Sequence, residues 1–409
     1  MKYDFDEKVD RLGTNSIKRE AWKTLLLGLP PDYEMPYPEE DYALLWVADM
    51  DFAVAPEILS AMHKRLDRRI LGYTSLIDFE YQNVLAAWAE RRYGWHIKPE
   101  QMLHSKGSIP GVKNILTLVT RPGDKVLLMV PSYSPFKTAC DMNGLELAHT
   151  TLLNDNGYFT IDWNDFETKA KDPMVKAFIL CSPHNPTGRV WTETELRKMG
   201  EICIKNNVFI ISDEIHGDLI RVGKKHIPIA SLFPQEKTIA ACFAPSKTFN
   251  LAGNEFANVI VQDPGIASKW DTVDFNFMVN PLSVAAAIAA YSECDSWLEQ
   301  LKEYIDGNLA FLENSFHTHL PKAIFKIPEG TYLAWIDVSA YCADISEKLS
   351  LFIAKHAPAI IENGSGFIGG SGKCIRINAA CPRSSFIKGI EGICNTLKIP
   401  RNKKENQDD

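Results

Sequence analysis

The stretch Ala244-Pro245-Ser246-Lys247-Thr248-Phe249-Asn250 follows directly on an apolar run at 238–243. That run is short and resembles a buried strand that ends where the polar residues begin. Three similar runs, at 125–130, 177–181 and 208–211, also end in polar segments. Helical patterns separate the runs, and this alternation is typical of a mostly parallel sheet with helices on both faces. The sequence therefore predicts an α/β fold for this part of the chain.

A polar residue follows each of the four runs: Tyr133, Asn185, Asp213 and Lys247. Ligands of open α/β sheets bind beyond the carboxyl ends of the strands, so we expect these residues to share one site. A lysine there is suited to imine formation with an aldehyde cofactor, which activates it for exchange with an amino acid. Asp213 could keep a pyridine nitrogen protonated, so the set points to pyridoxal phosphate.

The other cofactor contacts can be assigned by the same chemistry. Asn185 can donate to the phenolate oxygen of the ring, and Tyr133 can stack on its face. The phosphate needs backbone amides at the start of a helix. The segment Ser105-Lys106-Gly107-Ser108-Ile109 opens an apolar helical stretch, and Gly107 permits close approach. We therefore expect the phosphate to bind at residues 107–109.

Composition limits the class of partner. The chain has 409 residues, is 45% hydrophobic and 23% charged, and carries a formal net charge of -8. No block of basic residues precedes the polar tail at 401–409, which disfavours nucleic acid and favours a small-molecule partner. The longest apolar stretch near a helical pattern, 284–290, is far shorter than the roughly 18 residues of a membrane span, so we expect no membrane partner.

The start of the chain and its cysteines indicate the compartment. Residues 1–8 are charged where a secretory signal would be apolar, so we expect no targeting segment. The nine cysteines form no Cys-x-x-Cys pair, which argues against zinc clusters and against a disulfide framework. These features favour the cytoplasm.

We expect the chain to be divided into four segments. Residues 1–55 form an N-terminal arm, with a short helix at 16–27 and a Pro- and acid-rich stretch at 30–41, and contribute to a smaller domain. Residues 56–291 form the large cofactor-binding domain. Its helical patterns are predicted at 79–93, 109–120 and 193–206.

Residues 292–400 are predicted to form the smaller α+β domain. A long helical pattern runs from 281 past 312, and 325–327 and 332–337 alternate as antiparallel strands do. The apolar segment 44–50 needs a neighbour for its apolar side, and we expect it to pack against this domain. The final residues, 401–409, are expected to be disordered.

Three motifs suggest other chemistry but do not fit their surroundings. Gly364-Ser365-Gly366-Phe367-Ile368-Gly369 matches a dinucleotide fingerprint, yet no strand-helix-strand unit surrounds it. Gly372-Lys373 lacks the earlier glycine and the following hydroxyl of a phosphate loop. His317 and His319 have no evident further ligands, so no metal site is predicted.

Several motifs together resemble the aminotransferase class I/II family of fold type I pyridoxal-phosphate enzymes. Within it they are similar to the cystathionine β-lyase branch, the MalY/PatB C-S lyases. The matching segments occur in the order typical of the family and lie at 46–52, 72–74, 131–136, 182–189, 212–216, 244–253 and 376–383. The resemblance implies a PLP-dependent transferase-like (fold type I) α/β large domain with a mixed, mostly parallel sheet, plus a smaller α+β domain.

The resemblance also implies residue roles. Lys247 carries the cofactor as a Schiff base, Asp213 pairs with the pyridine nitrogen, Asn185 bonds the ring oxygen and Tyr133 stacks on the ring. Arg376 clamps the substrate α-carboxylate, a role that suits its planar fork. Further contacts with the cofactor are assigned to His216, Ser246 and Tyr73, and with the substrate to Ala48 and Asp49.

Tyr73 is expected to reach the cofactor phosphate of a neighbouring subunit, which implies a homodimer with shared sites. Two positions depart from many class I relatives. Ala244 stands where these have serine, and His216 stands where these have tyrosine. We expect Ser246 to supply a phosphate hydroxyl instead, and we assign His216 no proton transfer.

The implied reaction is β-elimination from L-cysteine S-conjugates, with cystathionine as the leading substrate and homocysteine, pyruvate and ammonia as products. Lys247 removes the Cα proton, and a thiolate leaves from Cβ. An aminotransferase on the same scaffold and a cofactor-bound regulator of another protein are the alternatives. Simpler readings of single residues also stand: Asp213 as a helix N-cap, Arg376 as a strand arginine paired to an acid, Tyr133 as a core aromatic and Tyr73 as a surface turn residue.

Overall fold

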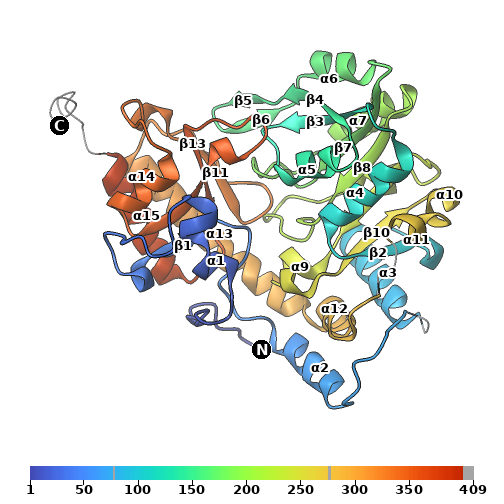
Figure 1. Ribbon diagram of the computed structural model, residues 1–409, viewed down its shortest axis with the longest axis horizontal. Coiled ribbons are helices and arrows are strands. Elements are labelled where there is room, and N and C mark those ends of the chain that lie inside the picture. The colour runs from blue at the N-terminus through green and yellow to red at the C-terminus, as the bar shows by residue number, and fades with distance from the viewer. Residues whose placement is uncertain (77–78, 275–277, 399–409) are drawn as a thin grey trace.

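The computed structural model describes residues 1–76, 79–274 and 278–398, so the predicted disordered tail at 401–409 lies outside the described residues. Two sheets organise the chain, and Figure 1 shows them side by side with a helical layer around each. No helix among the described residues has both the length and the apolar character that crossing a membrane requires.

The larger sheet has seven strands in the order β2-β10-β9-β8-β7-β3-β4. The strands from β9 to β4 pair in parallel, whereas β10 is antiparallel to both of its neighbours. This confirms the predicted mixed, mostly parallel sheet. The strand bounds are β2 Met102–Ser105, β3 Lys125–Val130, β4 Glu146–Thr151, β7 Val175–Cys181, β8 Phe209–Asp213, β9 Ile239–Phe243 and β10 Ala257–Val261.

Helices cover both faces of this sheet. Along β3, Val126 and Leu128 belong to one core cluster, and Leu127 and Met129 belong to another, because successive side chains of a strand point to opposite faces. The helices of this part are α2 Pro56–Leu66, α3 Glu80–Tyr93, α4 Ser108–Val119, α5 Pro135–Asp141, α6 Trp163–Ala170, α7 Glu193–Lys205, α8 Ile229–Leu232, α9 Pro245–Thr248, α10 Pro264–Ala267, α11 Trp270–Val273 and α12 Pro281–Glu293. The three predicted helices correspond to α3, α4 and α7.

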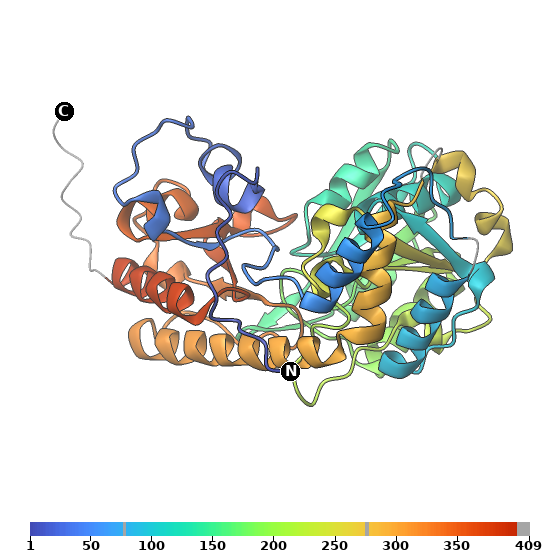
Figure 2. The same cartoon turned by 90° about the horizontal axis from the view of Figure 1, so that it is seen from below.

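The smaller sheet has the order β1-β12-β13-β11. Its strands are β1 Ala43–Leu45, β11 Leu333–Asp337, β12 Ala359–Asn363 and β13 Cys374–Asn378, and its helices are α13 Asp295–His319, α14 Leu349–His356 and α15 Arg383–Leu397. Strand β1 of the arm pairs in parallel with β12, which confirms that segment 44–50 packs on this part. Figure 2 shows the long helix α13 running beneath it.

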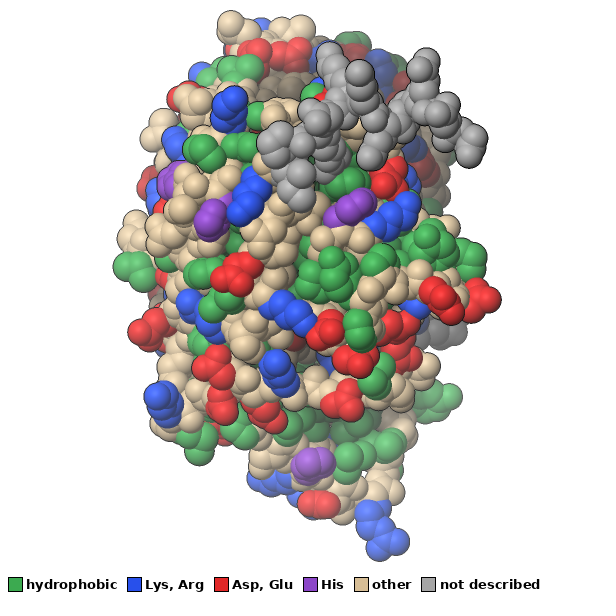
Figure 3. All heavy atoms as spheres, turned by 90° about the vertical axis from the view of Figure 1, so that its left-hand side faces the viewer, with side chains coloured by type: hydrophobic (Ala, Val, Ile, Leu, Met, Phe, Trp, Pro, Cys, Tyr) green, Lys and Arg blue, Asp and Glu red, His purple; other side chains and the backbone are tan. Residues whose placement is uncertain are grey.

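The remaining elements are short. A hairpin of β5 and β6 lies beside the larger sheet, and single helical turns connect longer elements. Their bounds are β5 Leu153–Asp155, β6 Tyr158–Thr160, α1 Ile17–Glu20, the π-helix Trp22–Leu26, and the 3-10 turns Glu39–Asp41, Pro99–Gln101, Ala252–Asn254, Ser339–Tyr341 and Gly364–Gly366. Figure 3 looks onto the smaller part, where charged side chains of both signs are interspersed.

Three local predictions need correction. Residues 325–327 form no strand, since only Ile324 bridges to Asp337 and Pro328 follows at once. The long helical pattern is two helices, α12 and α13, that break at Cys294. The helix predicted at 16–27 is a four-residue α-helix followed by a π-helical turn.

We propose that residues 1–55 and 292–400 form the smaller domain and that 56–291 form the larger one. The arm supports this division because Trp22, Tyr42 and Trp46 share an apolar cluster with Ile360 of β12. The segment 364–369 lies between β12 and β13, which are antiparallel neighbours, so it does not belong to a strand-helix-strand unit.

Candidate active site

A cavity of about 200 Å³ lies at the carboxyl ends of β7, β8 and β9. Each predicted site residue lines it except Tyr73, Asp49 and Arg376. Its lining residues are Ala48, Lys106, Gly107, Ser108, Ile109, Pro110, Tyr133, Phe136, Cys181, Asn185, Asp213, Ile215, His216, Ser246, Lys247, Ala252 and Phe256. The polar segments that follow four separate strands are therefore brought together, as predicted.

Lys247 lies on α9, the one-turn helix that follows β9. Pro245 occupies the first turn of this helix, where its missing N–H costs nothing. The Nζ atom of Lys247 donates to the carbonyl oxygen of Ala48 at 2.7 Å. Burial lowers the pKa of Lys247, Arg376 lowers it further, and Asp49 and Asp213 oppose the change. The amine is thus easier to deprotonate than an exposed lysine.

The residue after this lysine is tied to the protein interior. Thr248 donates its hydroxyl to Asp218 at 2.9 Å, and the hydroxyl of Tyr93 on α3 donates to the other oxygen of the same carboxylate. Both Thr248 and Asp218 are buried. The turn that carries Lys247 is therefore linked to helix α3 through the Asp218 carboxylate.

Asp213 is the last residue of β8, rather than a residue that follows the strand. Its side chain is buried, and its neighbours are the hydroxyl of Ser108 at 3.4 Å and the amide of Ile215 at 3.3 Å. Burial raises the pKa of Asp213 to about 7. A cation placed against this carboxylate would offset the cost of its burial, so the position suits a protonated ring nitrogen.

Asn185 and Arg376 form a pair beside the cavity. Arg376 Nη1 donates to Asn185 Oδ1 at 3.0 Å, and Arg376 Nη2 also pairs with Glu362. Arg376 lies on β13, is 2% exposed, and has the ring of Phe367 4.9 Å from its guanidinium carbon. The cation is therefore held next to the site, and it is also a strand arginine paired to an acid.

The aromatic residues of the cavity are held in apolar surroundings. Tyr133 packs edge-on against Phe136, and burial raises its pKa. Burial lowers the pKa of His216 to about 3, so its ring is neutral near neutral pH. His216 lies edge-on to Tyr332, with ring centroids 6.1 Å apart.

The amino end of α4 supplies backbone amides to the cavity. The helix begins at Ser108, one residue after Gly107, and the first N–H groups of a helix have no acceptor within it. They are suited to binding an anion. The side chain of Ser108 turns toward Asp213 instead. Lys106 also lines the cavity and brings a positive charge to this end.

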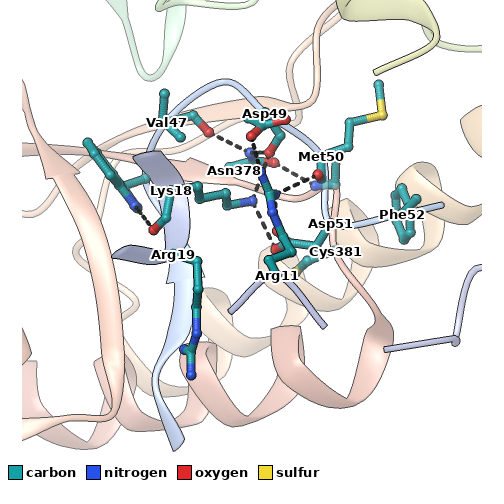
Figure 4. A network of polar contacts seen from close by, with 12 residues as sticks. Arg11, Lys18, Arg19, Val47, Asp49, Met50, Asp51, Phe52, Asn378 and Cys381 are labelled. Atoms are coloured by element: carbon teal, nitrogen blue, oxygen red, sulfur yellow. Dashed lines mark hydrogen bonds and ion pairs between the residues drawn. The ribbon is translucent and has the colours of Figure 1, made fainter. Parts of the chain in front are cut away.

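The loop at 47–52, which carries Ala48, is bound by charged side chains of the arm (Figure 4). Lys18, which is fully buried, donates to the Asp49 carbonyl at 2.7 Å and to the Asp51 carboxylate at 2.9 Å. Arg11 pairs with the carboxylates of both Asp49 and Asp51. The arm thus fixes the wall of the site that faces Lys247.

Two asparagines hold the same loop from other directions. Asn378 on β13 donates to the carbonyls of residues 47 and 49 at 2.8 Å each. Asn250, three residues beyond Lys247, accepts from the amide of Met50 at 3.1 Å and donates to its carbonyl at 3.2 Å. The carbonyl of Ala48, which accepts from Lys247, therefore lies in a loop held by hydrogen bonds from the arm, from Asn378 and from Asn250.

Two further predicted residues lie away from the cavity lining. Asp49 faces Arg11, although its charge still acts on Lys247. Tyr73 lies on the segment between α2 and α3 and is 96% exposed. Tyr73 is thus far more accessible than the other predicted site residues.

Sequence reasoning missed several residues that shape the site. Lys106 lies inside the segment predicted to bind phosphate, so its charge was a usable signal. Glu362 and Asn378 could not be assigned, because each depends on the pairing of β13 with its neighbours. Lys18 and Arg11 lie in the arm, and nothing in their surroundings marks them as partners of the loop at 47–52.

A model of the family Aminotransferase class I and II matches residues 40–390 of the chain. The chain belongs to this family. It is similar to "Cystathionine beta-lyase PatB" of Bacillus subtilis, with 36% identity over 394 residues that cover 95% of this chain and 98% of that protein. It is also similar to "Protein MalY" of Escherichia coli, with 28% identity, covering 98% and 100% of the two chains.

Solved structures in the family agree with this placement. The PLP-bound C-S lyase from Staphylococcus hominis has a TM-score of 0.91 and 39% identity, and the match covers 97% of this chain and 98% of that one. Cystalysin from Treponema denticola, which contains pyridoxal 5'-phosphate, has a TM-score of 0.87 and 33% identity, with 97% and 99% covered. The chain therefore has the fold type I architecture.

Proposed function

We propose that the protein is a pyridoxal-phosphate-dependent carbon-sulfur β-lyase that cleaves L-cysteine S-conjugates, with L-cystathionine as the leading substrate. The products are a thiol, pyruvate and ammonia. The observation that carries the proposal is the convergence of Lys247, Asp213, Asn185 and Tyr133 on one cavity. Full-length similarity to a cystathionine beta-lyase and to a C-S lyase structure supports it.

The residues of the cavity fit this cofactor. Asp213 is a buried carboxylate that forms no ion pair with any cation of the described residues, and a protonated pyridine nitrogen would supply a cationic partner. Lys247 is a buried amine with a lowered pKa, suited to attack an aldehyde. The amides at 107–109 open a helix where a phosphate can bind. When bound, the cofactor supplies the aldehyde for the substrate amine and an electron sink for the Cα carbanion.

The residues of this chain then perform the remaining tasks. Arg376 would orient the substrate through its α-carboxylate, and its hydrogen bond to Asn185 holds the guanidinium beside the cavity. The amine of Lys247 would accept the Cα proton of the substrate, and the Ala48 carbonyl keeps this amine near the site. Expulsion of sulfur from Cβ is favoured because a thiol has a pKa of about 8.5 and leaves readily as thiolate.

Incubation with cystathionine in the absence of any keto acid tests the proposal. We expect equal amounts of pyruvate and free thiol, and Lys247→Ala should abolish both together with the visible absorbance of the bound cofactor. Amino transfer to 2-oxoglutarate without thiol release would support an aminotransferase instead. Slow turnover of every S-conjugate, together with tight binding to a protein partner, would support a regulatory role.

We further propose a homodimer in which Tyr73 serves the neighbouring site. The segment between α2 and α3 supports this, because Ile70, Leu71 and Tyr73 are all exposed, although apolar or aromatic side chains grouped in this way usually meet a partner. Mixing Tyr73→Ala chains with Lys247→Ala chains tests the sharing. A mixed dimer holds one site with both residues intact, so activity should reappear only after subunits exchange.

We also propose that the protein works in the cytoplasm. All nine cysteines are buried free thiols, the state that a reducing compartment maintains. Fractionation of cells that express the tagged protein tests this proposal, which fails if the protein is recovered outside the cytoplasmic fraction.

A further inference from the structure

The guanidinium of Arg376 forms an ion pair with a carboxylate of the same chain, that of Glu362. In the smaller sheet, Glu362 of β12 stands directly opposite Arg376 of β13 in the antiparallel register. Side chains of directly opposed residues lie close enough to interact. The carboxylate of Glu362 pairs with Nη2 of the guanidinium, and the Glu362 side chain is 25% exposed, whereas that of Arg376 is 3% exposed. The buried cation therefore has a neighbour that reaches toward solvent.

Two of the three nitrogens of the Arg376 guanidinium have hydrogen-bond partners, and the third has none among the described residues. Nη1 donates to Asn185 Oδ1, Nη2 is held by Glu362, and Nε is buried without a partner among the described residues. A carboxylate binds arginine across two neighbouring nitrogens, either Nε with Nη2 or Nη1 with Nη2. Nη2 belongs to both pairs. Glu362 thus takes one of the two N–H groups of the nitrogen that any two-point contact with a substrate carboxylate must use, and it places a like charge beside that contact.

Glu362 also acts on the cofactor end of the site. Tyr133 lies at the cavity wall, and its pKa is raised by burial, lowered by Arg376 and raised by Glu362. Both charges are therefore close enough to be felt where the ring is proposed to lie. A second carboxylate arriving at Arg376 meets this negative charge at short range, where like charges repel strongly in a partly buried site.

We propose that Glu362 is a positioning residue that sets the affinity of the site for carboxylates, because it competes with the α-carboxylate of the substrate for Arg376. This proposal rests on the carboxylate-binding role of Arg376 in the proposed function. Glu362 keeps the buried cation neutralised while the site is empty, and it lowers the affinity for every ligand that binds through a carboxylate, including the product pyruvate. Glu362 therefore weakens the binding of substrate, and for the same reason it favours the release of product.

Two hypotheses about Glu362, competition with the substrate or support of Arg376, predict opposite results for Glu362→Gln. The glutamine oxygen can still accept from Arg376, so the arginine stays in place, but the negative charge is lost. If Glu362 competes, the KM for S-conjugates falls about tenfold while kcat changes less than about threefold. If Glu362 only supports Arg376, KM rises, and that result, or an unchanged KM, overturns the proposal.

A binding measurement separates this proposal from the lyase proposal. Propionate has a carboxylate but no amine, so it can bind Arg376 without reacting at the cofactor. The rise of Tm with propionate concentration gives its Kd, because a ligand at free concentration c that binds the folded state stabilises it by RT ln(1 + c/Kd). We expect about tenfold tighter propionate binding in Glu362→Gln, whether or not the protein cleaves cystathionine. Propionamide, which is uncharged, should show no difference between the two proteins.

Two further variants complete the design. Glu362→Asp keeps the charge, so its propionate Kd should stay within about threefold of the unmodified protein. Glu347→Gln is the matched control, because Glu347 also pairs with a cation of the smaller part, Lys355, at 2.8 Å and has a side chain 31% exposed. An equal gain of propionate affinity in Glu347→Gln would refute a local effect at Arg376.

Discussion

Replacing Asp213 with asparagine should stabilise the cofactor-free protein and destabilise the cofactor-bound protein. Asp213 is 3% exposed, and burial raises its pKa to about 7 from an ordinary value of 3.8. A carboxyl whose folded-state pKa is raised contributes most to stability when protonated. That contribution is present below about pH 4 and is lost as the pH rises through about 7.

The size of the effect follows from the pKa difference. About three pH units at about 1.4 kcal/mol each give an upper value of ~4 kcal/mol for the cost of holding Asp213 ionised at about pH 8. Asparagine has no charge to bury and keeps an oxygen that can accept from Ser108. The variant should therefore exceed the unmodified protein in free energy of unfolding by up to ~4 kcal/mol near pH 8, and by close to nothing near pH 4.

Urea unfolding of the cofactor-free chains at several values between about pH 5 and about pH 8 measures this difference. Asp218→Asn is the control, because Asp218 is equally buried but accepts hydrogen bonds from Tyr93 and Thr248, so its loss should destabilise at every pH. A difference between Asp213→Asn and the unmodified protein that is absent, or that does not grow with pH, would refute the reasoning.

Addition of pyridoxal phosphate should make the unmodified protein more stable than Asp213→Asn, the reverse of the order expected without cofactor. With a protonated pyridine nitrogen opposite it, the ionised Asp213 is one half of a buried ion pair, and removal of one partner of such a pair costs about 3–5 kcal/mol. Asp213→Asn should therefore bind pyridoxal phosphate more weakly, and its Tm should rise less when the cofactor is added. An equal rise in Tm would mean that Asp213 does not face the ring nitrogen.

Three other changes have defined outcomes. Lys18→Met removes a fully buried cation but leaves Arg11 paired with Asp51, so it should cost about 1.5–3 kcal/mol in urea unfolding, the value of hydrogen bonds to a charged group, whereas Lys23→Met removes a more exposed pair and should cost less than ~1 kcal/mol. Gly188→Ala should lower Tm, because Gly188 has a φ of +70° and a Cβ there would clash with the side chain of Pro328, whereas a Cβ at Gly253 would meet nothing within 4 Å, so Gly253→Ala should leave Tm unchanged. Tyr73→Ala should weaken cofactor binding about 10- to 100-fold, the loss expected for one hydrogen bond to a charged phosphate, with little change in unfolding of the cofactor-free chain; equal cofactor affinity would contradict sharing between subunits.

The strands of the larger sheet and the site residues at their ends could be predicted because both signals are local. An apolar run marks a strand that is buried on both faces, and the chain must leave the sheet where the run ends. Lys247, Asn185 and Tyr133 follow such ends. Asp213 differs, since β8 continues two residues beyond the predicted end at 211 and includes Asp213, and strand ends are set by pairing with the neighbours as well as by composition.

The smaller part was harder to predict because its structure depends on distant partners. Residues 325–327 alternate like a strand, but the isolated bridge at this place joins Ile324 to Asp337, and 325–327 pair with no strand of the described residues. The pairing of Glu362 with Arg376 follows from the register of β12 and β13, which no local pattern encodes. The break at Cys294 is also invisible to periodicity, because the apolar pattern continues across it from α12 into α13.

The loop at 47–52 has a consequence for how the protein is made. It is braced by Lys18 near the start of the chain and by Asn378 near its end, and β1 has only β12 as a partner in its sheet. Contacts across so much sequence form late in folding. A chain emerging from the ribosome therefore cannot complete the wall of the site beside Lys247 until nearly all of the chain has been synthesised. Tight binding of pyridoxal phosphate should accordingly follow translation rather than accompany it.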